Sequence, residues 1–307
     1  MANCYLLIAI CCNNCIMKSR VLFIVVLLMP IILHAQTNAQ HGYCDVSGGK
    51  IYYEAAGQGH ALVLIHGGQL DRRMWDEQFQ FFSPKYKVIR YDVRGFGNSP
   101  AATKPFSSHE DLAALLKCVK VDKAYIVGLS LGGRIAIDFA LAHPEMVDAL
   151  IPVAPGLSGF NFGNDPNELA ILKAAQAGDF QKATDLWLQS GYMAPAMKNP
   201  QIAPRIRQLA LDNAHANLDN FLLDKDVFSS AIERLSEIKV PTLIVVGSAD
   251  VQAIHEITGL LHARIAHAQE VVIQGAGHMI NMERPQEFNS AVLEFLEKQS
   301  VVKMEKR

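Results

Sequence analysis

The sequence predicts an α/β fold in which a mostly parallel central sheet is flanked by helices and interrupted by an inserted helical cap. Short apolar runs alternate with segments of helical periodicity over residues 42–153 and again over 242–296, the pattern of a sheet covered by helices. Between these stretches, residues 155–236 show several helical segments and no clear strand. With 307 residues, the chain is long enough for one such domain with an insertion.

The first half of the core is expected to open with a hairpin and then alternate strands with helices. Ser47-Gly48-Gly49 suits the hairpin turn, and Ser107 or Ser108 suits the cap of a helix that has acidic residues in its first turn. The run 61–65 is apolar throughout, which is typical of a fully buried strand. The expected strands are 42–46, 51–55, 61–65, 87–93, 124–129 and 147–153, and the expected helices are 71–82, 108–119 and 131–142.

The second half resumes the alternation after the insertion. Pro285 suits the first turn of a final helix. We therefore assign residues 36–154 and 237–307 to the core and residues 155–236 to the cap. The expected cap helices are 167–176, 180–190, 202–211 and 226–235; the expected later elements are strands 242–247 and 270–273 and a helix over 285–296.

Residues 1–35 are interpreted as a signal peptide. Lys18 and Arg20 precede the apolar run 21–33, which is too short to cross a bilayer, and Ala35 is the small residue a signal peptidase prefers. Met17 stands at the natural start of such a signal, so residues 1–16 are interpreted as an upstream extension. We therefore expect an exported protein, periplasmic or secreted, that keeps no membrane anchor after cleavage.

Cysteine usage agrees with export but does not establish it. Of the six cysteines, four would leave with the signal, and Cys44 and Cys118 remain. Two cysteines do not make a disulfide framework. Because one belongs to an early strand and the other to the end of a distant helix, we expect them to be unpaired.

Charge and motif patterns argue against several classes of partner. The net charge is −2 and no basic stretch suggests a nucleic-acid partner. No G-x-G-x-x-G opens a helix after the first strand, so no dinucleotide is implied, and the histidines show no metal-ligand spacing. We expect a small-molecule substrate, no metal and no cofactor; the oligomeric state stays open.

Ser130 is the first candidate catalytic residue. It lies in Gly128-Leu129-Ser130-Leu131-Gly132-Gly133, between a buried apolar run and a predicted helix. A serine between glycines at a sharp strand-to-helix turn stands clear of the sheet, with its oxygen near a helix N-terminus. This context predicts a nucleophile elbow.

A serine nucleophile needs a base and a group that orients the base. His278 follows the predicted strand 270–273, and Asp250 follows the strand 242–247, so both lie at C-terminal strand ends where open parallel sheets place their sites. The chain order Ser130, Asp250, His278 is the nucleophile–acid–histidine order of this architecture. We therefore expect these three residues to form a catalytic triad.

An oxyanion also needs hydrogen-bond donors. One candidate is the backbone N–H of Leu131, the first residue of the predicted helix. The second should come from the loop after strand 61–65, where Gly68 is the best candidate and Gln69 the next. His66, in the same loop, is expected to hold that loop rather than to carry a proton.

Together these motifs resemble the α/β-hydrolase fold enzymes of the capped, single-domain type. The resemblance covers roughly residues 42–297, and it rests on five motifs in the right order. Within that family, the segment 70–76 and the stretch 178–188 resemble 3-oxoadipate enol-lactonases and small carboxylesterases. The motifs are His66-Gly67-Gly68, the run 92–99, the run 128–133, Gly247-Ser248-Ala249-Asp250 and Gly277-His278.

The resemblance implies a serine hydrolase that cleaves a small carboxylic ester or lactone through an acyl-enzyme. Three different functions stay open beside it: a C–C bond hydrolase of vinylogous diketones, a cofactor-free perhydrolase, and a non-catalytic ligand-binding protein on the same fold. The cap decides the substrate, and four of its residues are candidates for the pocket wall: Phe160, Trp187, Tyr192 and Met193.

Overall fold

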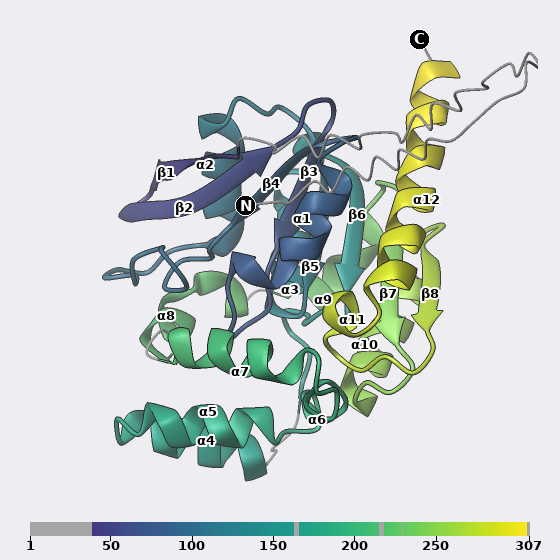
Figure 1. Ribbon diagram of the computed structural model, residues 1–307. Helices are drawn as coiled ribbons and strands as arrows, with labels where there is room; N and C mark the ends of the chain where they lie inside the picture. Colours follow the sequence, from purple (N-terminus) through teal and green to yellow (C-terminus); the bar gives the residue numbers. More distant parts are fainter. Residues whose placement is uncertain (1–38, 163–165, 215–217, 229, 306–307) are drawn as a thin grey trace, which may run out of the picture. The chain divides into compact units, whose positions relative to one another are not determined.

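The computed structural model describes residues 39–162, 166–214, 218–228 and 230–305 (Figure 1). The expected signal peptide lies outside these residues. The described chain forms one eight-stranded sheet. Its strands are β1 (Gln40–Val46), β2 (Gly49–Ala56), β3 (Ala61–Ile65), β4 (Lys87–Tyr91), β5 (Ala124–Leu129), β6 (Val147–Val153), β7 (Leu243–Gly247) and β8 (Gln269–Ile273).

The strand order is β1-β2-β4-β3-β5-β6-β7-β8. The pairs β1–β2 and β2–β4 are antiparallel and all later pairs are parallel. Because β3 pairs with β4 on one side and β5 on the other, chain order reverses around β3, and a crevice opens at the carboxyl ends of β3 and β5. Ile65 of β3 lies opposite Gly128 of β5 in that register, so the loops that follow these strands start side by side.

Helices cover both faces of the sheet, as expected. In Figure 1, α1 and α12 lie in front of the sheet and α2, α3 and α10 lie behind it. Helix α10 was not among the expected elements, although its buried residues recur at helical spacing. The core helices are α1 (Asp76–Phe82), α2 (Ser108–Cys118), α3 (Leu131–Ala142), α10 (Gln252–Arg264), α11 (Ile280–Glu283) and α12 (Pro285–Glu305), with short 3-10 turns at Arg72–Trp75 and Pro144–Met146.

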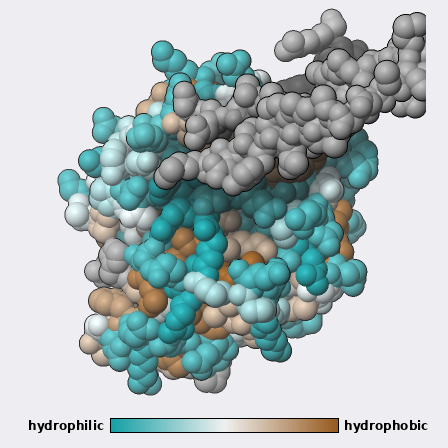
Figure 2. All heavy atoms as spheres, viewed as in Figure 1, coloured by the Kyte–Doolittle hydropathy of each residue, from teal (hydrophilic) through white to brown (hydrophobic). Residues whose placement is uncertain are grey.

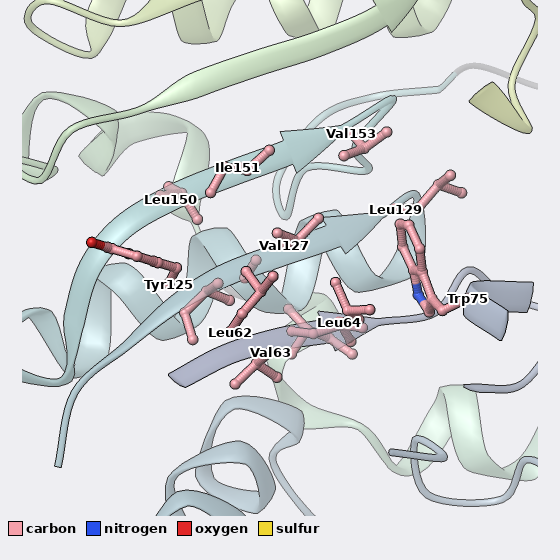
Figure 3. Close-up of a cluster of buried hydrophobic side chains, with 14 of the residues drawn as sticks. Leu62, Val63, Leu64, Trp75, Tyr125, Val127, Leu129, Leu150, Ile151 and Val153 are labelled. Carbon is pink, nitrogen blue, oxygen red and sulfur yellow. The ribbon is translucent and has the colours of Figure 1, made fainter. Parts of the chain in front are cut away.

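Side chains of the central strands fill the core. Strands β3, β5 and β7 are buried at every position, which is why apolar runs without alternation predict them well. Figure 3 shows aliphatic side chains of β3, β5 and β6 packed together, with Trp75 beside Leu129. Trp75 is fully buried and its ring also faces Phe288 of α12 at 5.8 Å. The sheet under the site is therefore well packed.

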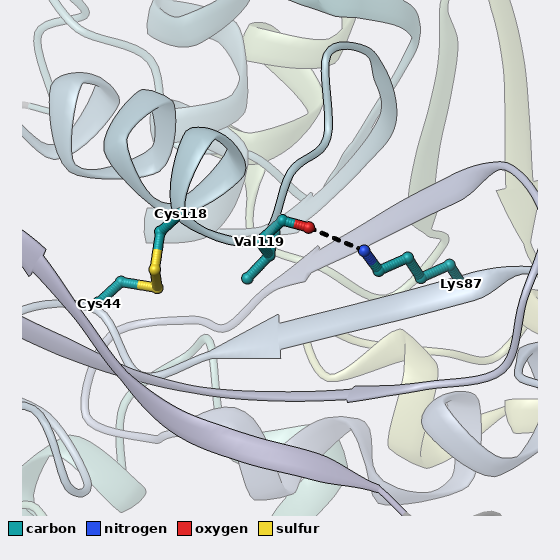
Figure 4. Close-up of a disulfide and its surroundings, with 4 residues drawn as sticks. All are labelled: Cys44, Lys87, Cys118 and Val119. Atoms are coloured by element: carbon teal, nitrogen blue, oxygen red, sulfur yellow. Dashed lines mark hydrogen bonds between the residues drawn. A yellow bond between two sulfur atoms is a disulfide. The ribbon is translucent and has the colours of Figure 1, made fainter.

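Cys44 and Cys118 form a disulfide, so the expectation that they are unpaired was wrong (Figure 4). The bond joins β1 to the last residue of α2 across a sequence separation of 74 residues, with 6.0 Å between the Cα atoms. Helix α2 packs against β1, and this contact between distant segments is what brings the two thiols together. Beside the bridge, Lys87 Nζ donates to the Val119 carbonyl at 2.9 Å.

The segment between β6 and β7 is helical, as expected for the cap. Two short helices, α6 and α8, were not expected there, and the predicted helix 226–235 is broken into shorter pieces. The elements are α4 (Pro166–Gln176), α5 (Phe180–Leu188), α6 (Ala194–Met197), α7 (Ala203–Asp212), α8 (Leu218–Leu223), α9 (Ala231–Arg234), and 3-10 turns at Lys225–Phe228 and Leu235–Glu237.

The first backbone N–H groups of α2 are bonded by aspartates outside the helix, and not by the hydroxyl groups of Ser107 or Ser108. The Ser107 side chain makes no capping bond to the helix and instead donates to Asp226 at 2.6 Å. The N–H groups of Ser108 and His109 donate to the carboxylates of Asp224 and Asp226, at 3.4 and 3.0 Å. Both aspartates follow α8, so the cap segment adds negative charge to that of Glu110 and Asp111 in the first turn of this helix.

Asp71, in the core, forms a second set of contacts with the cap, at the residue that ends α7. Its carboxylate accepts bonds from the Arg73 N–H, the Arg73 guanidinium and the Asn213 amide, all at 2.6–2.9 Å. Burial alone would raise the pKa of Asp71, but these bonds outweigh burial and lower the pKa from 3.8 to about 2. The folded protein therefore holds this carboxylate ionised where the unfolded chain would protonate it.

Replacing Asp71 with asparagine should lower the free energy of unfolding in a pH-dependent way. The pKa of Asp71 is lower in the folded state than in the unfolded chain. The stability that the ionised carboxylate contributes is therefore present above about pH 4 and is lost as the pH falls toward 2. The depression corresponds to about 2 kcal/mol. Urea unfolding from pH 7 to pH 2 should show a difference in the free energy of unfolding between the wild type and Asp71→Asn, and this difference should disappear below pH 4. The exposed Asp122→Asn variant is the control, and a difference that stays constant with pH would contradict the assignment.

The surface is mostly hydrophilic on the face shown in Figure 2, with apolar residues gathered in its lower part, where the cap helices lie. Exposed apolar side chains of the cap include Phe162, Leu169, Phe180 and Leu222. Among the described residues, no helix combines the length and apolar character that a membrane crossing requires.

Candidate active site

Ser130 lies at a strained turn between β5 and α3. Its φ of 55° and ψ of −112° put a non-glycine residue in a sparsely populated backbone region. The turn is held on both sides: the Ser130 N–H donates to the Val153 carbonyl at 3.0 Å, and its carbonyl accepts from the N–H groups of Arg134 and Gly156. The strand, sharp turn and helix expected around Ser130 are therefore present, which is the backbone geometry that a nucleophile elbow requires.

The glycines around Ser130 are required by close backbone contacts. A Cβ at Gly128 would lie 2.0 Å from the Gly132 carbonyl oxygen, and a Cβ at Gly132 would lie 2.2 Å from the Ile65 carbonyl oxygen. These contacts involve backbone atoms, which cannot move aside as a side chain could. The start of α3 therefore lies in close contact with the end of β3, beside the loop that is expected to supply an oxyanion-hole donor.

His66 holds that loop. It is fully buried, its Nε2 accepts the Val93 N–H at 2.8 Å, and its Nδ1 lies 2.8 Å from the Gly67 carbonyl oxygen. Because Nε2 accepts, the proton is on Nδ1 and is donated to Gly67. Burial lowers the pKa of His66, which agrees with a neutral ring. Gly68 and Gln69 follow, and Gln69 has a φ of 62°.

His278 and Asp250 lie together at the ends of β8 and β7. The His278 Nδ1 is 2.9 Å from Asp250 Oδ2, and both side chains are buried. The other oxygen, Asp250 Oδ1, accepts the Val251 N–H at 2.8 Å. An aspartate that accepts the Nδ1 proton leaves Nε2 as the basic nitrogen of the ring. The ring of Tyr192 faces the imidazole edge-on, with 5.1 Å between centroids.

Glu283 is a functional candidate that the sequence does not reveal. Its buried carboxylate accepts the N–H of Gly277 at 2.9 Å and the N–H of Met279 at 3.0 Å. The two bonds hold the backbone on both sides of His278. Burial raises the pKa of Glu283, and the two N–H donors oppose that rise. A glutamate five residues after a histidine carries no motif, so only the folded loop reveals that Glu283 holds the backbone around His278.

Glu283→Gln should reduce kcat about 10- to 100-fold with little change in KM. The amide has one acceptor oxygen in place of two, so one of the two N–H bonds is lost and His278 is held less firmly. Steady-state kinetics on an activated ester measures kcat and KM separately. The exposed Glu287→Gln variant, nearby on α12, should behave as the wild type. An unchanged kcat for Glu283→Gln would show that the loop does not need this carboxylate.

Ser130 and His278 line one cavity of about 260 Å³. Gly68, Gln69 and Leu131 also line it, so the structure brings together all the candidate oxyanion residues with two members of the expected triad. Leu131 is the first residue of α3, and the first N–H groups of a helix have no partner within it.

A second, larger cavity of about 370 Å³ adjoins the first. Both are lined by Gly68, Gln69, Leu131 and Trp187, and α4 and α5 supply much of the second wall. Of the four pocket candidates, Trp187 lies in both cavities and Tyr192 in the smaller one. Met193 is fully buried, and Phe160 packs against Phe162 at 5.0 Å between ring centroids. Neither residue contributes to these two cavities.

The two arginines in the wall of the larger cavity are paired with buried carboxylates. Arg94 contacts Asp111 at 2.6 Å. Arg134 contacts Asp224 at 2.5 Å and Asp138 at 3.3 Å, so one guanidinium serves two acids. Burial raises the pKa of Asp138 to about 6, and Arg134 only partly offsets it. Neither arginine is thus available as an uncompensated positive charge.

Comparison with known proteins identifies the family. A model of the alpha/beta hydrolase family matches residues 62–291, and the chain belongs to this family. The expected fold class and the resemblance to its capped hydrolases are confirmed.

Named relatives include an esterase and another hydrolase. The chain is 29% identical over 268 residues to the pimeloyl-[acyl-carrier protein] methyl ester esterase of Aeromonas hydrophila, covering 80% of this chain and 99% of that protein. It is 28% identical over 278 residues to the 2-hydroxy-6-oxo-6-phenylhexa-2,4-dienoate hydrolase of Burkholderia cepacia, covering 80% and 91%. The structure of the enol-lactonase from Burkholderia xenovorans LB400 matches with a TM-score of 0.73 at 24% identity, covering 83% and 100%.

Proposed function

We propose that the protein is a serine hydrolase that cleaves a neutral carboxylic ester or lactone through an acyl-enzyme. The observation that carries the proposal is the shared cavity of Ser130 and His278, with His278 Nδ1 2.9 Å from Asp250. A nucleophile, a base and a group that orients the base are the parts that acyl transfer requires. The esterase among the relatives supports the same reaction class.

In this mechanism, Ser130 Oγ attacks the carbonyl carbon while His278 Nε2 takes its proton. Asp250 keeps the imidazole in the required tautomer and stabilises the imidazolium. The Leu131 N–H and an N–H from Gly68 or Gln69 bind the oxyanion. His278 then protonates the leaving alkoxide, and a water deprotonated by His278 releases the acid and frees the serine.

The larger cavity supports a neutral, apolar group on the substrate. The two arginines in its wall are paired with carboxylates, while Phe96, Phe106 and Leu172 add apolar surface. A substrate carboxylate would be desolvated there without a compensating charge, at considerable cost. This argues against a C–C bond hydrolase, because the Burkholderia cepacia relative is named for a dienoate, which carries a carboxylate.

A panel of p-nitrophenyl esters from acetyl to long acyl, with matched lactones and a vinylogous diketone acid, tests the proposal. Each methylene buried in the larger cavity contributes about 0.8 kcal/mol, so kcat/KM should rise about fourfold per added methylene until the cavity is filled. Leu172→Asp should flatten that dependence, and the exposed Leu169→Asp is its control. Preferred cleavage of the diketone acid would favour the C–C hydrolase.

Two further measurements distinguish the ester hydrolase from a binding protein and from a perhydrolase. A fluorophosphonate should label Ser130, and absence of labelling in the folded protein would favour the non-catalytic binding protein. Peroxide-dependent halogenation in acetate buffer that exceeds ester hydrolysis would favour the perhydrolase.

We also propose that the protein is exported, with residues 1–35 removed. The Cys44–Cys118 disulfide supports this, because structural disulfides persist in oxidising compartments such as the periplasm. Mass spectrometry of the protein recovered from the native cell envelope should find an N-terminus near Gln36. An intact N-terminus on a cytosolic protein would contradict it.

A further inference from the structure

Three potential metal ligands meet where the start of α2 lies beside the end of α3. His109 and Glu110 belong to the first turn of α2, and His143 directly follows α3. One ligand atom from each of the three residues lies within 4.8 Å of the others. Glu110 and His143 are 33 positions apart in the chain, so the sequence shows no metal-ligand spacing here. Only the packing of α2 against α3 brings them together.

The distances among these atoms fit one small cation. Glu110 Oε1 is 3.4 Å from His109 Nε2 and 3.1 Å from His143 Nε2. Ligands at about 2.0–2.1 Å from a tetrahedral zinc ion lie roughly 3.3 Å from one another. The two distances to Glu110 match this spacing, and the ligand atoms of the two histidines lie within 4.8 Å of each other, so a side-chain rotation of one ring would place all three atoms around one ion.

Each imidazole also has a carboxylate near its other nitrogen. Asp226 Oδ2 lies 2.9 Å from His109 Nδ1, and Glu145 Oε1 lies 3.8 Å from His143 Nδ1. Asp226 is close enough to accept the Nδ1 proton of His109, which leaves Nε2 as the ligand atom and raises its basicity, the usual arrangement behind metal-bound histidines. Glu145 is too far from His143 for a hydrogen bond and contributes only its nearby negative charge. Both Nε2 atoms face Glu110, so the two rings present the correct nitrogens to the same point.

We propose that His109, Glu110 and His143 bind one divalent first-row transition ion, with Zn²⁺ as the reference ion. Two imidazoles and one carboxylate form a typical zinc ligand set, and water can fill the fourth position. The donors suit zinc, nickel or copper rather than Mg²⁺, which prefers oxygen ligands. The side chains of His109, Glu110 and His143 are 21%, 56% and 18% exposed, so an ion can enter from solvent.

With the proposed ion bound, both ends of α2 would be attached to neighbouring elements. The disulfide ties the last residue of this helix to β1. The ion would tie its first turn to the end of α3, the helix that begins beside Ser130. The site does not depend on the proposed hydrolase activity, because none of its three ligands lines either cavity.

Isothermal titration of the untagged, metal-stripped protein with Zn²⁺ tests the proposal. We expect one ion per chain, no measurable binding of Mg²⁺, and at least a tenfold weaker affinity in Glu110→Gln and in His143→Gln. The exposed His262→Gln variant is the matched control and should bind as the wild type does. Circular dichroism in chelator should show that all three variants are folded.

A second measurement reports on stability. At free Zn²⁺ of 100 times Kd, the ratio of folded to unfolded protein should rise about 100-fold. That gain should disappear in His143→Gln and persist in His262→Gln. If the wild type takes up no zinc, or if His143→Gln keeps full affinity and places the ion elsewhere, for example at His278, the proposal is overturned.

Discussion

Ser130→Ala is expected to lower kcat for ester hydrolysis about 10⁶-fold, the size of loss measured when the nucleophile of another serine hydrolase is removed. The reason is that the acyl-enzyme can no longer form, although the oxyanion donors and the cavity remain. The elbow itself should persist, since the bonds that hold it use the backbone of residue 130 and not its hydroxyl. Alanine at this φ of 55° carries the same strain as serine.

Burst and steady-state assays with a p-nitrophenyl ester measure this loss. Ser248→Ala is the matched control, because Ser248 also follows a strand but its hydroxyl accepts the Gly275 N–H, away from the cavity. It should keep nearly full activity. Ser130→Ala retaining more than one percent of wild-type kcat, with contamination excluded by fluorophosphonate labelling, would refute the nucleophile assignment.

Removing the disulfide with Cys44→Ala and Cys118→Ala should lower the free energy of unfolding by about 4 kcal/mol. A bridge that closes a loop of 74 residues removes that much conformational entropy from the unfolded chain. Native packing near the bridge should change less, because alanine leaves only a small gap at the buried Cys44 site.

Urea unfolding of the oxidised wild type, the reduced wild type and the double variant measures the effect. The reduced wild type should match the double variant, which separates the cross-link from the packing of the sulfurs. A loss under 1 kcal/mol would mean that the unfolded chain is already compact around this loop.

Fully buried elements were predictable from sequence. Strand β3 at Ala61–Ile65 and helix α3 at Leu131–Ala142 have the bounds expected, because an apolar run or a glycine turn marks each end. The cap was less predictable, since short helices such as Ala194–Met197 have too few turns to show a period. The first turn of the helix predicted at 71–82 is a 3-10 turn over Arg72–Trp75.

Site residues were likewise predictable where a sequence motif marks them, and not elsewhere. Ser130, Asp250 and His278 each follow a strand within a recognisable motif, so the fold alone brings them to one edge. The disulfide, Glu283 and the carboxylates of Asp224 and Asp226 have no local signature. The disulfide and the two aspartates join segments that are far apart in the chain, and Glu283 bonds backbone N–H groups of its own loop. In each case the role depends on packing or loop geometry that sequence patterns do not describe.

The unequal attachment of the cap has a consequence for how substrate enters. Near the start of α2, Asp224 and Asp226 accept backbone N–H groups, and at α7 Asn213 binds Asp71. The pair α4 and α5 instead forms the outer wall of the larger cavity and lies beyond α7 in Figure 1. Asp185 of α5 pairs with Arg207 of α7 at 2.6 Å, and both side chains are partly exposed. We therefore expect any movement of α4 and α5 during substrate entry to turn about this ion pair, while the buried bonds of α7 keep it fixed to the core. Because Trp187 of α5 borders both cavities, such a movement would also change the passage between them.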